Sequence, residues 1–148
     1  LMEAAGDDGD FDALCQQLHR YQATLRTCFT LENFDNLIKN GRMRPIVGTL
    51  LRSLGIHIIA DATAEGTIHV ADKARGVGKT YRAITALMKA SKDCTDAEVV
   101  ISHCENLEGA MALKRQILAD LPVKQVDLLS CRGLTSFYAM EKGLIVGY

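Results

Sequence analysis

A short basic, glycine-rich segment offers the first candidate for chemistry. Residues 75–80 read Arg-Gly-Val-Gly-Lys-Thr, which matches the end of a phosphate-binding loop of the P-loop type. The complete motif requires a glycine five residues before Gly78, and Lys73 occupies that position. We therefore predict that this segment binds no nucleotide. Because positive side chains at the start of a helix oppose its dipole, the segment instead indicates contact with an outside anion or an acidic partner.

Cysteine and histidine side chains are the other candidates for nucleophilic or metal chemistry. The five cysteines include no CxxC pair, which argues against a zinc site and a disulfide framework, and we expect free thiols in the cytoplasm. The four histidines include no HxxxH or HExxH spacing, so we expect no metal site. His103 and Cys104 are neighbours in the sequence. Adjacent strand residues point to opposite faces, which argues against a thiolate–imidazole pair here.

The composition excludes several classes of protein. The chain has 148 residues, of which 48% are hydrophobic and 24% are charged, and its net charge is -1. These values are typical of one soluble globular domain, and they exclude a nucleic-acid binder that relies on a broad basic surface. No apolar run approaches the about 20 residues that span a bilayer. The chain opens with helix-forming residues, and we expect it to be a fragment of a longer protein.

The hydrophobic pattern predicts helices and strands in a mixed order. Helical spacing of apolar residues predicts helices over 10–24, with Asp10 as the N-cap, and over 33–39, 45–55, 78–92 and 106–120. Short β-branched and aliphatic runs predict strands over 27–31, 56–60, 67–71, 98–102, 123–129 and 144–148. The turn at 64–66 indicates a hairpin. This order favours an α+β fold, with helices packed on a mixed, largely antiparallel sheet, over a doubly wound Rossmann sheet.

Four segments, in order along the chain, resemble the sequence signatures of the DegV family. Residues 28–43 are similar to the strand–helix–GGRI segment of that family, and residues 54–59 to its LLNIKPIL segment. Residues 73–79 resemble its K-x-RG-x-KKA segment, and residues 129–148 occupy the place of its GTHTGPGALG ending. The resemblance therefore covers nearly the whole chain, with matching spacing.

The resemblance implies a fold, a ligand and a partner. DegV-like proteins are two-domain α/β bacterial proteins that bind one fatty acid between the domains, and some are the fatty-acid-binding subunit of a fatty acid kinase. Residues 1–25 are then the end of the preceding domain or a linking helix, and residues 26–148 are the C-terminal lipid-binding domain. We expect a long-chain fatty acid as ligand, no cofactor, and no enzymatic activity of this chain alone. The preceding domain, which supplies Ser and Thr contacts to the head group, is expected to lie outside this chain.

The resemblance also assigns roles to polar residues. Arg42 matches the family arginine that contacts the ligand head group, and a guanidinium suits a carboxylate because it offers paired donors in one plane. Without the resemblance, Arg42 fits better as a surface arginine that caps helix carbonyls. Cys131 stands where the family has a histidine, and because a thiol is a weaker donor, Ser130 is a further head-group candidate. Arg75 and Lys79 match the basic segment that faces the kinase, although a solvated charged turn would look the same.

An acyl chain requires a dry aliphatic slot, since each buried methylene contributes about 0.8 kcal/mol. The candidates for lining such a slot are Leu50, Leu54, Ile58 and Leu128. The same aliphatic residues would also suit an ordinary core. Two other functions stay open: an interaction domain that no longer binds fatty acid, and an enzyme domain that uses Arg42 and Cys131. No residue supplies a general base for an enzyme domain, so the enzyme hypothesis ranks last.

Overall fold

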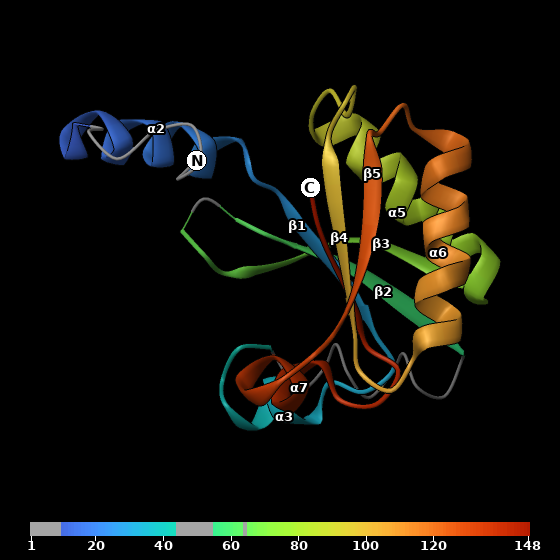
Figure 1. Ribbon diagram of the computed structural model, residues 1–148. Coiled ribbons are helices and arrows are strands. Elements are labelled where there is room, and N and C mark those ends of the chain that lie inside the picture. Colours follow the sequence, from blue (N-terminus) through green and yellow to red (C-terminus); the bar gives the residue numbers. More distant parts are fainter. Residues whose placement is uncertain (1–9, 44–54, 64) are drawn as a thin grey trace.

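The computed structural model describes residues 10–43, 55–63 and 65–148 (Figure 1). The elements in chain order are α2 (Phe11–Thr24), β1 (Thr27–Leu31), α3 (Asp35–Lys39), β2 (Ile56–Ala62), β3 (Ile68–Arg75), α5 (Val77–Ser91), β4 (Glu98–His103), α6 (Leu107–Asp120), β5 (Gln125–Ser130), α7 (Gly133–Ala139) and β6 (Leu144–Gly147). The helix predicted from Pro45 lies outside the described residues. Within them, no helix is long and apolar enough to cross a membrane.

The strands form one six-stranded sheet in the order β3-β2-β1-β6-β4-β5. Only β4 and β5 run parallel, and every other neighbouring pair in this sheet is antiparallel. The crossover from β4 to β5 passes through α6, as a parallel pair requires. The predicted α+β fold with a mixed, largely antiparallel sheet is therefore confirmed.

Helices α5 and α6 cover one face of the sheet (Figure 1). Their apolar sides pack on alternate residues of the strands, because successive strand residues point to opposite faces. The buried residues between them, which we call the first cluster, include Cys28, Ile59, Ile84, Met88, Val99, Ile101, Leu113, Ile117, Val126, Leu144 and Val146. This cluster is the main core of the domain.

The opposite face of the sheet carries a second cluster, made of Leu31, Phe34, Leu37, Met43, Ile58, Ala60 and Ala139. Among the described residues, the helices that pack here are α3 and α7, which lie together at one end of the sheet (Figure 1). The rest of this face carries no described helix. The two faces are therefore covered unequally.

Helix α2 stands away from the sheet (Figure 1). Asp10 caps it as predicted, since its carboxylate accepts a hydrogen bond of 3.0 Å from the Asp12 amide. The helix has no buried residue, and the side chains of Phe11 and Tyr21 are 74% and 51% exposed. The predicted apolar stripe thus exists, but it packs on no described part of this chain.

Helix α7 was not predicted from the sequence. Its sequence, Gly-Leu-Thr-Ser-Phe-Tyr-Ala, contains residues with low helix propensity. Its buried residue is Ala139, which belongs to the second cluster. Tertiary packing therefore stabilises this helix, and it ends where Met140 takes a φ of 53°.

Candidate functional site

The uncovered part of the second face is apolar along its central strands, β1 and β6. Phe29 of β1 lies directly opposite Ile145 of β6, and both side chains are only partly buried against the second cluster. The alternation of the strands puts them on the side that α5 and α6 do not cover. Two partly exposed apolar side chains on adjacent strands form an apolar surface on which an apolar ligand or another domain could pack.

Arg42 borders one end of this face because of the way α3 ends. Gly41 has a φ of 69°, and the amides of Gly41 and Arg42 donate to the carbonyls of Ile38 and Leu37 at 3.0 and 2.8 Å. This pair of hydrogen bonds is the Schellman motif, in which glycine takes the left-handed position. The predicted role of Gly41 is confirmed, and the turn directs the chain so that Arg42 reaches α7.

The Arg42 guanidinium lies over the ring of Tyr138, with its central carbon 5.4 Å from the ring centroid. This cation–π contact orients a side chain that is otherwise exposed. One of its nitrogens donates to the Asn40 carbonyl at 2.9 Å. The guanidinium keeps further donors, enough for a carboxylate.

Ser130 and Cys131 lie at the N-terminal end of α7, whereas Tyr138 lies near its C-terminal end. Ser130 is the last residue of β5, and Cys131 follows directly and leads into α7. Ser130 is exposed and Cys131 is half-buried, and both line a cavity of about 400 Å³ together with His103 and Asn106. Burial raises the pKa of the Cys131 thiol, and so does the neighbouring Cys104. Cys131 therefore stays protonated at neutral pH and acts as a weak donor.

The predicted acyl-lining residues do not lie together. Ile58 belongs to the second cluster, on the open side of the sheet. Leu128 packs against the first cluster, under α6, so the sheet separates it from Ile58. Leu50 and Leu54 lie outside the described residues. The residues that sequence reasoning missed are Phe29, Ile145 and Tyr138, because nothing local in the sequence tells which face of a strand stays open.

The basic segment is a tight strand-to-helix turn. Strand β3 ends at Arg75 and α5 begins at Val77, so Gly76, with a φ of 83°, is the whole connection. A single residue cannot wrap a phosphate chain, which agrees with the rejection of a nucleotide site. Arg75 and Lys79 are both exposed, and α5 has no side-chain cap at its N-terminus.

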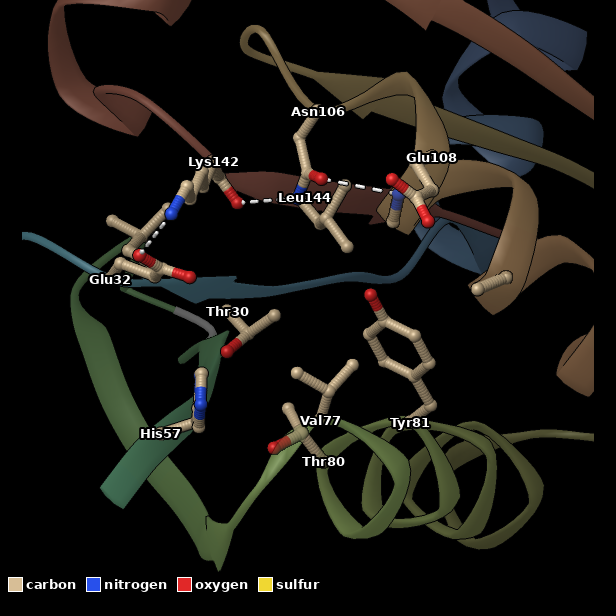
Figure 2. Close-up of a pocket in the computed structure, with 13 residues that line it drawn as sticks. Thr30, Glu32, His57, Val77, Thr80, Tyr81, Asn106, Glu108, Lys142 and Leu144 are labelled. Carbon is tan, nitrogen blue, oxygen red and sulfur yellow. Dashed lines mark hydrogen bonds and ion pairs between the residues drawn. The ribbon is translucent and has the colours of Figure 1, made fainter. Parts of the chain in front are cut away.

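A separate pocket of about 240 Å³ lies on the face that α5 and α6 cover (Figure 2). At the rim of this pocket, Lys142 Nζ lies 3.6 Å from Glu32 Oε2. Figure 2 shows the Tyr81 hydroxyl directed into the pocket. Burial raises the pKa of Tyr81, and so do Glu32 and Glu108. The buried Thr30 hydroxyl beside it has no hydrogen-bond partner within the described structure. Asn106 lines both this pocket and the cavity beside α7.

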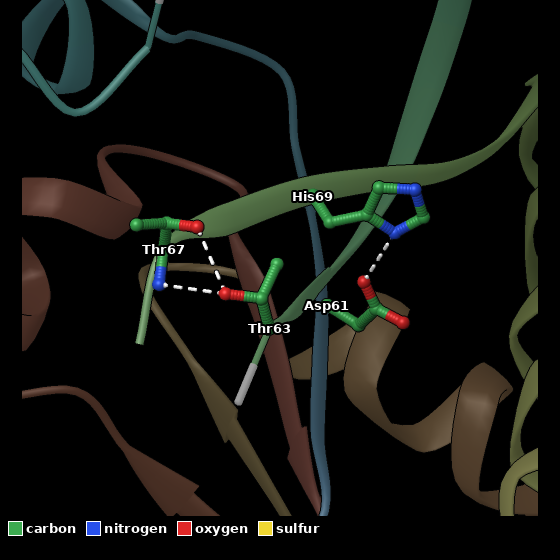
Figure 3. Close-up of polar contacts among 4 residues, drawn as sticks. All are labelled: Asp61, Thr63, Thr67 and His69. Atoms are coloured by element: carbon green, nitrogen blue, oxygen red, sulfur yellow. Dashed lines mark hydrogen bonds and ion pairs between the residues drawn. The ribbon is translucent and has the colours of Figure 1, made fainter. Parts of the chain in front are cut away.

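The β2–β3 hairpin holds another polar group (Figure 3). The Thr63 hydroxyl contacts the Thr67 hydroxyl at 2.9 Å, and His69 Nδ1 lies 2.8 Å from Asp61 Oδ1. These contacts hold the predicted hairpin turn, of which Ala64 lies outside the described residues. No group of three or more His, Cys, Asp or Glu side chains in the described ranges could hold a metal ion.

Comparison with known proteins places the chain in a family. A family model described as an uncharacterised protein of the DegV family matches residues 1–144. The chain belongs to the DegV family. A DegV domain-containing protein of Streptococcus gordonii is 32% identical over 139 residues, which are 93% of this chain and 49% of that protein. This DegV chain therefore spans about half the length of the curated relatives that it matches.

Solved DegV structures share its fold. The Streptococcus pneumoniae fatty acid kinase B3 protein, loaded with linoleic acid, is 32% identical with a TM-score of 0.84, over 94% of this chain and 49% of that chain. A DegV family protein of Ruminococcus gnavus with vaccenic acid is 30% identical with a TM-score of 0.86, over 99% of this chain and 51% of that chain. Both of these solved structures thus contain a bound fatty acid.

Proposed function

We propose that this DegV chain forms one wall of a fatty-acid site that it shares with a second domain. The observation that carries this proposal is the partly open apolar stretch around Phe29 and Ile145, bordered by polar groups at the α7 end. An acyl chain would lie along the apolar stretch, since its burial is the main source of affinity. Relatives of 30% and 32% identity with vaccenic and linoleic acid support this ligand class.

The carboxylate of the ligand would lie near α7. Arg42 supplies a positive charge there, held by Tyr138 and ready to donate to an anion. Ser130 would donate a further hydrogen bond, and the protonated Cys131 a weak one. Of the predicted acyl-lining residues, Ile58 lies on this side of the sheet, but it is fully buried in the second cluster, so an acyl chain would lie above it without touching it in this arrangement.

The second domain would cover the apolar residues that this chain leaves exposed. These include Phe11 and Tyr21 on α2, and Leu134 on α7, which is 71% exposed. Matched relatives are about twice as long as this chain, which leaves room for one further domain. Residues 1–25 would then be the link to that domain, and residues 26–148 the C-terminal lipid-binding domain.

The protein would act as a carrier and not as an enzyme. Arg75 and Lys79, both exposed at the turn between β3 and α5, would face an acidic surface of a fatty acid kinase. The likeness to a fatty acid kinase B3 protein supports such a partner. The five free thiols suit the cytoplasm, where cysteines stay reduced.

Native mass spectrometry of the longer protein and of the 148-residue chain tests this proposal. We expect a co-purified fatty acid on the longer protein and none on the chain alone, because one wall leaves much of the ligand in water. Loss of Arg42 removes a charged hydrogen bond, so Arg42→Ala should weaken fatty-acid binding about 10- to 150-fold. Arg115→Ala is the matched control, since Arg115 is an exposed arginine of α6 on the opposite side of the sheet.

Three results would contradict the proposal. A longer protein that neither carries nor takes up fatty acid would favour the interaction domain. A fatty acid bound tightly by the chain alone would show that the site is not shared. Equal effects of the Arg42 and Arg115 substitutions would remove Arg42 from the head-group site.

A further inference from the structure

Cys104 and Cys131 are 27 positions apart in the sequence but neighbours in the sheet. The parallel register of β4 and β5 ends with His103 opposite Ser130, and the two cysteines directly follow these residues. The Cys131 amide donates to the His103 carbonyl at 2.8 Å, so the ladder continues by one step. Neighbouring strands lie about 4.8 Å apart, which falls within the Cα separation of about 4.4–6.8 Å that disulfides require.

Both thiols lie on the same side of the sheet. Cys104 and Cys131 both pack against the second cluster and both line the cavity beside α7. They are half-buried, so a small reagent can reach them, whereas Cys28 and Cys94 are buried in the first cluster. The burial-raised pKa of Cys131 also reflects the nearby Cys104. The fifth cysteine, Cys15, lies on α2, away from the sheet (Figure 1).

We propose that Cys104 and Cys131 are a modification site, a thiol pair that a peroxide oxidises to a reversible intramolecular disulfide. One thiolate attacks a peroxide oxygen, which breaks the O–O bond, forms a sulfenic acid and releases hydroxide. The Cys131 thiol gives its proton to the released hydroxide, attacks the sulfenic sulfur as a thiolate, forms the S–S bond and expels the oxygen as hydroxide. The two thiol protons neutralise the two hydroxides, so two thiols and one peroxide give one disulfide and two waters. A dithiol reductant returns both thiols by exchange.

The bond would change the head-group end of the open face. Cys131 would lose its S–H donor, and the segment that leads into α7 would be tied to β4. This consequence rests on the proposed fatty-acid function, whereas formation of the disulfide does not. The oxidised protein should bind fatty acid about twofold to fivefold more weakly, the effect of one lost weak hydrogen bond.

Intact-mass measurement of the full chain after hydrogen peroxide treatment, with remaining thiols blocked by iodoacetamide, tests the site. We expect the loss of two hydrogens, reversal by dithiothreitol, and a peptide map that joins Cys104 to Cys131. Cys104→Ser and Cys131→Ser should each abolish the bond and gain oxygen on the remaining thiol. Cys15→Ser is the matched control and should still form it. Oxygen addition without a disulfide in the unmodified sequence, or a disulfide between other cysteines, would overturn the proposal.

Fatty-acid titration of the longer protein, reduced and oxidised, tests the consequence separately. Dithiothreitol should return the affinity of the oxidised protein to that of the reduced protein. Equal affinities of the reduced and disulfide forms would overturn the coupling to the head-group site. Absence of fatty-acid binding even in the reduced protein would contradict the proposed function, while the mass measurement would still decide whether the disulfide forms.

Discussion

Thr30 offers a direct test of the packing between β1 and α5. Its side chain is 6% exposed, and its Oγ1 has no hydrogen-bond partner in the part of the chain that the structure describes. A buried hydroxyl without a partner costs about 1–3 kcal/mol. Valine has the same shape with a methyl in place of the hydroxyl. We therefore expect Thr30→Val to raise the free energy of unfolding by about 1–2 kcal/mol.

Thr85 is the matched control for this substitution. It is buried to a similar extent, at 4% exposed, but its Oγ1 donates to Asp120 Oδ2 at 2.7 Å. Thr85→Val breaks that bond, so it should lower the free energy of unfolding. Hydrogen bonds from Thr85 and then Gln116 lower the pKa of the Asp120 carboxyl, so its pKa should rise in Thr85→Val.

Urea and thermal unfolding followed by circular dichroism measure both variants, because the chain has no Trp for fluorescence. For a domain of this size, 1 kcal/mol shifts the melting temperature by about 2–4 °C. The two variants should shift it in opposite directions. A lower melting temperature of Thr30→Val, or shifts of the same sign in both, would refute the assignment of an unpartnered Thr30 hydroxyl.

Three further predictions follow from the described residues. Burial raises the pKa of Tyr148 and, together with Asp61, that of Cys28, each to about 12, from ordinary values of 10.0 and 9.0. The folded state thus favours the protonated forms of both side chains. Their contribution to the free energy of unfolding should be complete below about pH 9 and should fall as the pH rises to about 12. An unfolding free energy that stays constant over this pH range would contradict the raised pKa values. Gly41→Ala should lower the free energy of unfolding by about 1–2 kcal/mol, because the φ of Gly41 is 69° and alanine is strained there. Gly78→Ala should raise it, because Gly78 lies in α5 and an added Cβ would meet no other atom. Urea titration of both variants measures the two changes. Isothermal calorimetry should detect no ATP binding, and saturable binding at residues 76–80 would contradict the reading of that turn.

Local sequence signals account for most of the elements. The apolar spacing after Asp10 predicts α2 within one residue, and the carboxylate of Asp10 caps the helix as its chemistry requires. Gly41 ends α3 because only a residue without a Cβ takes the left-handed position easily. The mixed order of hairpins and helices is enough for the α+β class. These features depend on residues a few positions apart, so the sequence determines them.

The candidate site depends on contacts between distant residues. The alternation along β2 and β5 is visible in the sequence, but only the packing of α6 places Leu128 on one face and Ile58 on the other. The parallel crossover brings Cys131 beside Cys104, which no local pattern indicates. Helix α7 forms although five of its seven residues have low helix propensity, because the second cluster buries Ala139. The tertiary structure decides these points because burial stabilises a side chain only where another element lies against it.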